Sequence, residues 1–132
     1  MAITSASRTQ VVLPNLVSMC NFDLRFNRHG QLATKESLAW LIRCGKLKNA
    51  DRQKFDGLKV GLLASNGYPD AGYPQLLVTT DFLNWLFHID DLTDDMDTLG
   101  TRSVAEVIIE ILEHPDVSPM TSSSRLEILT RR

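Results

Sequence analysis

Five carboxylates lie within eight residues of the 132-residue chain: Asp90, Asp91, Asp94, Asp95 and Asp97. On a helix, residues 90, 94 and 97 would share one face, where like charges one turn apart destabilise the helix by roughly 0.2–0.5 kcal/mol per pair. The carboxyl-terminal end of a helix also disfavours anions. Hard divalent cations would compensate, because carboxylate oxygens are their preferred ligands. The spacing therefore predicts a Mg2+ site, and the alternative is a solvated acidic end of a helix.

A tract rich in Phe, Leu and Trp comes directly before these carboxylates. Phe87 and Leu83 occupy the same helical stripe as Asp90, one and two turns earlier. We expect these two side chains to line an apolar substrate pocket, and ordinary core packing is an equally good alternative. His88 could act as a ligand or a base, but a lone histidine among apolar neighbours more often has a structural role.

A calcium loop is a second interpretation of the same region. Asp95, Asp97, Gly100 and Glu106 match positions 1, 3, 6 and 12 of the EF-hand pattern. Position 5 is Leu99, which offers no side-chain oxygen, and the sequence holds no second EF-hand to pair with the first. A chance match therefore explains the pattern better than a calcium site.

Composition narrows the classes of protein. The chain is 43% hydrophobic and 23% charged, with a formal net charge of -2, which suits one compact domain. A charge near zero excludes the broad basic surface of sequence-independent nucleic-acid binding. No apolar run approaches the ~20 residues of a membrane span, and the amino terminus lacks the apolar core of a secretory signal. We therefore expect a cytoplasmic, soluble protein.

The elements that would position the carboxylates are all helical. Hydrophobic spacing predicts helices over residues 34–45, with Thr34 as the N-cap, and over about 49–63, 74–97 and 101–113. In the second helix, Gly57 and Gly61 would let another helix approach closely. In the last helix, the side chains expected to face inward are Val104, Val107, Ile108, Ile111 and Leu112.

The chain divides into two parts at this level. Residues 1–115 carry the helical pattern, and we expect residues 116–132, which include a serine-rich stretch, to form a low-complexity, poorly ordered tail. Because alternating apolar and polar residues are almost absent, the fold class is all-α.

The run Asp90-Asp91-Leu92-Thr93-Asp94 has the form of the DDxxD motif of class I terpene cyclases. The wider segment 66–97, together with Leu13-Pro14, Asn27-Arg28-His29-Gly30 and Gly100-Thr101-Arg102-Ser103, resembles the amino-terminal part of fungal sesquiterpene synthases of the basidiomycete type. The resemblance covers residues 12–115. It implies the first few helices of the isoprenoid synthase α-helical bundle.

In that family, Mg2+ held by the motif grips the diphosphate of farnesyl diphosphate, so the resemblance implies Asp90, Asp91 and Asp94 as metal ligands. It also implies a carbon–oxygen lyase that ionises and cyclises the prenyl chain and releases diphosphate. An apolar wall, for which Leu83 and Phe87 are the candidates, would exclude water and stabilise positive charge.

Two motifs of the family do not occur in the sequence: the second metal motif, Asn-Asp-x-x-Ser-x-x-x-Glu, and the Arg-Tyr pair that senses diphosphate. The chain is therefore expected to supply one of two metal-binding walls. The alternative to an active synthase is a catalytically inactive fragment that binds metal or diphosphate weakly. In either case we expect apolar helix faces without a covering layer, which favours self-association.

Overall fold

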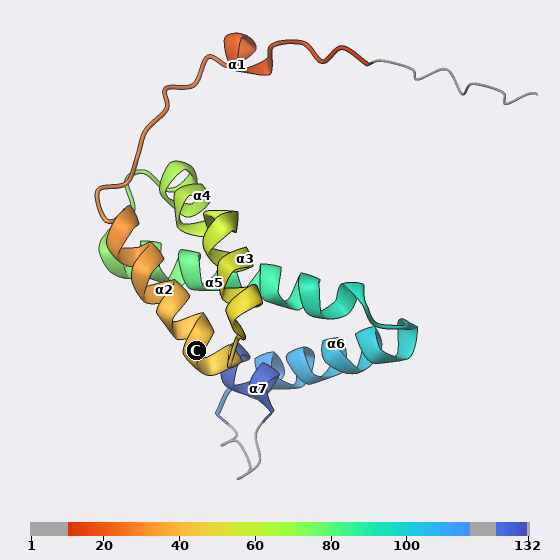
Figure 1. The fold of residues 1–132 in the computed structure, drawn as a ribbon. Helices are drawn as coiled ribbons and strands as arrows, with labels where there is room; N and C mark the ends of the chain where they lie inside the picture. The colour runs from red at the N-terminus through yellow and green to blue at the C-terminus, as the bar shows by residue number, and fades with distance from the viewer. Residues whose placement is uncertain (1–10, 117–123, 132) are drawn as a thin grey trace, which may run out of the picture.

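The computed structural model describes residues 11–116 and 124–131, and all regular secondary structure in these residues is α-helical (Figure 1). The helices are α1 (Leu16–Met19), α2 (Gly30–Gly45), α3 (Asn49–Leu58), α4 (Val60–Gly67), α5 (Tyr73–Asp94), α6 (Thr98–Glu113) and α7 (Arg125–Thr130). The predicted all-α class is confirmed. No described helix combines the length and the apolar character needed to cross a membrane.

The long helix α5 is the centre of the fold, and it packs against α2, α4 and α6 (Figure 1). Near its amino-terminal half, Leu76 forms a small buried cluster with Ala33 of α2 and Ala64 of α4. A larger cluster joins α2, α3 and α7 and contains Trp40, Leu41, Leu47, Phe55 and Leu129. Between the two clusters, the buried Asn84 Nδ2 of α5 donates a 2.7 Å hydrogen bond to Ser37 Oγ of α2.

Helix α2 begins at Gly30, one turn before the predicted N-cap Thr34, so that prediction is wrong. The cause is Asn27, a buried residue whose Oδ1 accepts a 2.8 Å hydrogen bond from the backbone N–H of His29. The Asn27 amide also donates to the carbonyls of Tyr68 and Ala71, both at 2.8 Å. Because the buried asparagine organises the turn at residues 27–29, the helix starts directly after it.

The predicted helix over 49–63 is in fact two helices, α3 and α4, separated at Lys59. Lys59 has a left-handed backbone with φ 54° and ψ 39°. The break turns the chain, so Phe55 of α3 packs beside Trp40 while Ala64 of α4 packs in the other cluster. One straight helix would not direct these two apolar residues into different parts of the core, so tertiary packing overrides the local pattern here.

The two glycines of this region have different environments. A Cβ on Gly61 would lie 2.6 Å from Thr34 Cβ, which shows that α4 and α2 are in close contact at this point. A Cβ on Gly57 would meet nothing within 4 Å. The predicted close approach of another helix is therefore confirmed at Gly61 and wrong at Gly57.

Helix α6 is mostly uncovered. Of the five residues predicted to face inward, Ile111 is buried, Val104 and Ile108 are partly buried, and Val107 and Leu112 are exposed. The helix begins at Thr98, one turn earlier than predicted, because Asp97 Oδ1 accepts a 2.8 Å hydrogen bond from the backbone N–H of Gly100. The amphipathic pattern is present, but the described residues cover only part of its apolar face.

The predicted low-complexity tail contains α7. Ser124 caps this helix by accepting a hydrogen bond from the N–H of Glu127, and Leu129 packs into the larger cluster. Residues 117–123 of the predicted tail lie outside the described residues.

Gly61→Ala should lower the free energy of unfolding by about 1–3 kcal/mol, because its methyl group overlaps Thr34 at the contact of α2 and α4. Gly57→Ala is the matched control. It should raise the free energy by about 0.5–1 kcal/mol, since it adds helix propensity in open space. Urea unfolding followed by circular dichroism measures both variants, and equal effects would contradict the assigned contact.

Candidate functional site

The carboxylate cluster spans the end of α5 and the start of α6. Asp90, Asp91 and Asp94 lie in the last two turns of α5, whereas Asp95 and Asp97 lie beyond its end. Asp97 was predicted to share a face with Asp90 and Asp94, and this is wrong because it caps α6 instead. The free N–H groups at the start of α6 attract this carboxylate away from the predicted stripe.

Asp90 and Asp94 form an open pair. Both side chains are exposed, and they are one helical turn apart on the same side of α5. Neither carboxylate has an ion-pair partner among residues 11–116 and 124–131. Two such carboxylates match the usual protein share of a Mg2+ site, in which water and phosphate oxygens complete the coordination.

The Asp91 carboxylate is already paired with a lysine. Its Oδ1 accepts a 2.7 Å hydrogen bond from Lys54 Nζ, which connects α5 to α3. This hydrogen bond, together with the negative charge of Asp91, raises the pKa of Lys54 above its usual value. Sequence reasoning did not identify Lys54, because no local pattern places it beside the motif.

In the described part of the chain, no three His, Cys, Asp or Glu side chains come together closely enough to enclose a metal ion. The donor chemistry of Asp90 and Asp94 fits one side of a magnesium site, and Asp91 would have to leave Lys54 to contribute. The assignment of Asp90, Asp91 and Asp94 as metal ligands stays a prediction.

The twelve residues 95–106 do not form an EF-hand loop. Helix α6 is continuous from Thr98, so nine of these twelve positions, including Gly100 and Glu106, lie on a regular helix. The Glu106 carboxylate accepts a 2.9 Å hydrogen bond from Arg102 Nε, four residues earlier.

Leu83 and Phe87 continue the stripe of Asp90 and Asp94 toward the middle of α5. Both are partly buried, Leu83 against the small cluster and Phe87 against the larger one. Core packing is thus part of their role, and lining of a substrate pocket stays a prediction. His88, one residue further, is also partly buried against the ring of Phe55, and this burial lowers its pKa.

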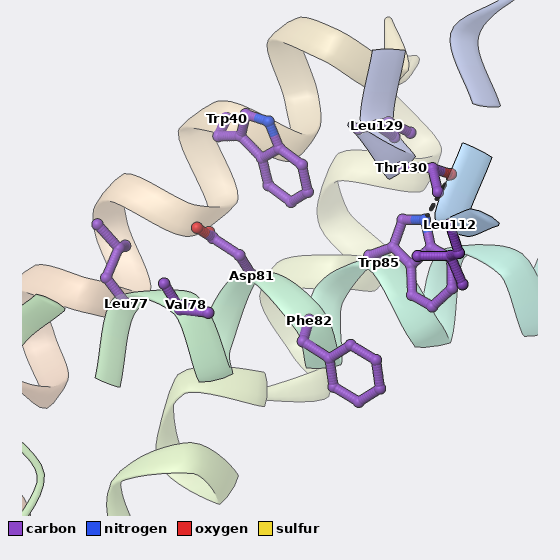
Figure 2. Close-up of a pocket in the computed structure, with 9 residues that line it drawn as sticks. All are labelled: Trp40, Leu77, Val78, Asp81, Phe82, Trp85, Leu112, Leu129 and Thr130. Atoms are coloured by element: carbon purple, nitrogen blue, oxygen red, sulfur yellow. Dashed lines mark hydrogen bonds between the residues drawn. The ribbon is translucent and has the colours of Figure 1, made fainter. Parts of the chain in front are cut away.

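The most apolar groove of the site region lies on a different side of α5 (Figure 2). It has a volume of about 310 Å3, and its wall includes Trp40, Val78, Phe82, Trp85, Leu112 and Leu129. The rings of Phe82 and Trp85 stack with centroids 5.7 Å apart, and Trp85 Nε1 donates a 3.2 Å hydrogen bond to Thr130 Oγ1. Asp81, which also lines the groove, is nine residues before Asp90 and so about 180° around the helix.

Sequence reasoning missed this groove because its walls come from α2, α5, α6 and α7. The aromatic residues of α5 could have indicated an apolar groove from the sequence alone. Their partners Trp40 and Leu129 are distant in the sequence, and nothing in the local pattern pairs them.

Comparison with known proteins finds similarity to fungal terpene synthases. Sesquiterpene synthase Agr1 of Cyclocybe aegerita is 47% identical over 122 residues, which are 92% of this chain and 35% of that protein. The chain is thus similar to fungal sesquiterpene synthases, in their amino-terminal part. Sesquiterpene synthase 1 of Postia placenta is 42% identical over 95% of this chain and 37% of its own length. Alpha-muurolene synthase of Coprinopsis cinerea is 37% identical over 86% of this chain and 27% of its own length.

The resemblance inferred from the motifs is therefore confirmed. The chain spans about a third of the length of the curated relatives it matches. No family model matches it.

The docking of α7 on α5 can be tested at Thr130. Thr130→Val should lower the free energy of unfolding by about 0.5–1.5 kcal/mol, because Trp85 Nε1 loses its acceptor. Thr130→Ser keeps the hydroxyl and should stay much closer to the wild type. If the valine variant unfolds at the wild-type urea concentration, the contact between α5 and α7 does not contribute to stability.

Proposed function

We propose that this chain is the metal-binding amino-terminal part of a Mg2+-dependent sesquiterpene synthase that acts on farnesyl diphosphate in the cytoplasm. The observation that carries the proposal is the open pair of Asp90 and Asp94 at the end of α5, in a chain that is 47% identical over 122 residues to a sesquiterpene synthase. Asp91, which lies between them in the motif, already has a partner in Lys54.

Each part of α5 has a distinct task in this proposal. Asp90 and Asp94 would hold Mg2+ from one side. Bound Mg2+ would neutralise the diphosphate and make it a better leaving group. Phe87 and Leu83 continue the stripe away from the carboxylates, where a prenyl chain attached to that diphosphate would lie. The Phe87 ring would also favour positive charge on the prenyl chain through a cation–π contact.

The competing function is a protein that binds Mg2+ and diphosphate without turnover. It is favoured by the open face of α6, where Leu112 is 65% exposed. Cyclisation of a reactive cation needs a cavity from which water is excluded, and Asp90 and Asp94 are exposed in this structure.

Metal binding tests the role of the open pair. Asp90→Asn and Asp94→Asn should each weaken Mg2+ binding, measured calorimetrically in the presence of inorganic diphosphate, by about tenfold or more, because each variant removes one charged ligand. Asp116→Asn removes an exposed carboxylate outside the motif and should leave the affinity unchanged. Equal losses in all three variants would indicate general charge screening and would contradict a site.

Measuring terpene formation distinguishes an active synthase from a protein that only binds Mg2+ and diphosphate. The chain alone, incubated with farnesyl diphosphate and Mg2+, should form no terpene detectable by headspace gas chromatography, because its apolar stripe is open to water. Asp90→Ala is the control. Terpene formed by the wild type and lost in Asp90→Ala would show that this chain completes a cavity, for instance by self-association, and would overturn the expectation of an incomplete one.

A further inference from the structure

A small pocket with basic side chains lies where α2 ends, between the start of α3, α5 and α7. We call it the basic pocket. It has a volume of about 190 Å3, and its wall includes Lys46, Lys48 and Arg125. Helix α7 lies beside the end of α2 (Figure 1), where a Cβ on Gly45 would be 3.6 Å from Leu129 Cδ1. This packing brings Arg125 to two lysines that are far from it in the sequence.

The protein leaves the positive charge of the basic pocket largely uncompensated. All sixteen Asp and Glu side chains lie in the described residues, and none of them forms an ion pair with Lys46, Lys48 or Arg125. Of these carboxylates only Asp51 lines the pocket, and it accepts a 3.3 Å hydrogen bond from the backbone N–H of Lys48. Three cations around one carboxylate leave an excess of positive charge that an anion would balance.

Lys46 occupies an unfavourable backbone conformation at the edge of the pocket. Its φ of 51° and ψ of 43° are left-handed, and glycine is the usual residue in this conformation at the end of a helix. A glycine would avoid the steric conflict, but it would contribute no charge. The presence of lysine here supports a role for its side chain.

The size and the other walls of the pocket favour a small oxyanion. Its volume is below the roughly 300–1,000 Å3 of pockets that hold organic ligands. His88 also lines the pocket, and its partial burial lowers its pKa, so a neutral imidazole can donate one ring N–H. Arginine and lysine are common ligands of phosphate groups, to which they donate charge-assisted hydrogen bonds.

We infer that the basic pocket binds a free phosphate-type oxyanion, held by Lys46, Lys48 and Arg125. The inference does not rest on the proposed function, because neither Asp90 nor Asp94 lines this pocket and the anion is bound without Mg2+. The anion would connect the end of α2 to the start of α7, and its binding would stabilise the packing of α7 by mass action.

Titration of the whole chain with inorganic phosphate tests the inference, followed calorimetrically in metal-free buffer at constant ionic strength. We expect saturable binding that Lys48→Gln and Arg125→Gln each weaken by about tenfold, because each variant removes a charge-assisted hydrogen bond. Lys35→Gln is the matched control. Lys35 is an exposed residue of α2 outside the basic pocket, so this variant has the same change in net charge and should keep the wild-type affinity.

Absence of saturable binding by the wild type would overturn the inference. Equal weakening in all three variants would also overturn it, because the loss would then follow net charge and not the pocket.

Lys46→Gly distinguishes loss of binding from loss of folding. This variant should weaken phosphate binding by about tenfold, yet it should withstand at least as much urea as the wild type, since glycine relieves the left-handed backbone. Unchanged phosphate binding in Lys46→Gly would contradict the inference.

Asp90→Asn shows whether the anion binds at the motif instead. In metal-free buffer this variant should bind phosphate as the wild type does, because Asp90 is outside the basic pocket. Loss of phosphate binding in Asp90→Asn would place the anion at the motif and overturn the inference.

Discussion

The packing of α5 on α2 determines most of the structure, and the buried hydrogen bond from Asn84 to Ser37 fixes it. Two apolar helix faces could slide or rotate against each other, but two buried polar groups must meet or each loses its hydrogen bond. Asn84 therefore points at α2. Asp90 follows six residues later and about 120° around the helix, so it points away from α2. One polar pair in the core thus sets the direction in which the motif faces.

The carboxylates around the motif are compensated in different ways, and the difference determines which of them are available to bind a metal ion. Asp91 is balanced by Lys54, and Asp97 by the free N–H groups at the start of α6. Asp90 and Asp94 form no ion pair in the described residues, although the charge of Asp94 also acts on Lys54. They therefore keep much of the cost of like charges at the negative end of a helix. A helix that retains such a cost is explained most simply by an external cation, which is why the two exposed aspartates carry more of the functional argument than the number of acidic residues does.

The sequence predicted what depends on local pattern: the all-α class, the long helix α5, and the family resemblance through the DDxxD motif and its neighbouring segments. The predictions were wrong where a residue far away in the sequence determines the local structure. The start of α2 depends on Asn27 contacting residues 68 and 71, and the break at Lys59 depends on two clusters assembled from five helices. Likewise, the stripe of Leu83 and Phe87 followed from helical spacing, whereas the groove on another side of α5 required Trp40 and Leu129. Metal binding itself stays a prediction.

Helix α7 has a consequence for access to the groove. Leu129 and Thr130 form one wall of it, and Leu129 is also part of the cluster around Trp40. A segment attached to the same chain acts at a high effective concentration, so α7 is an intramolecular competitor for the surface beside Trp85. Any further helix that packs beside Trp85 has to share that surface or displace α7. Helix α7 thereby sets the affinity threshold that such a helix must exceed.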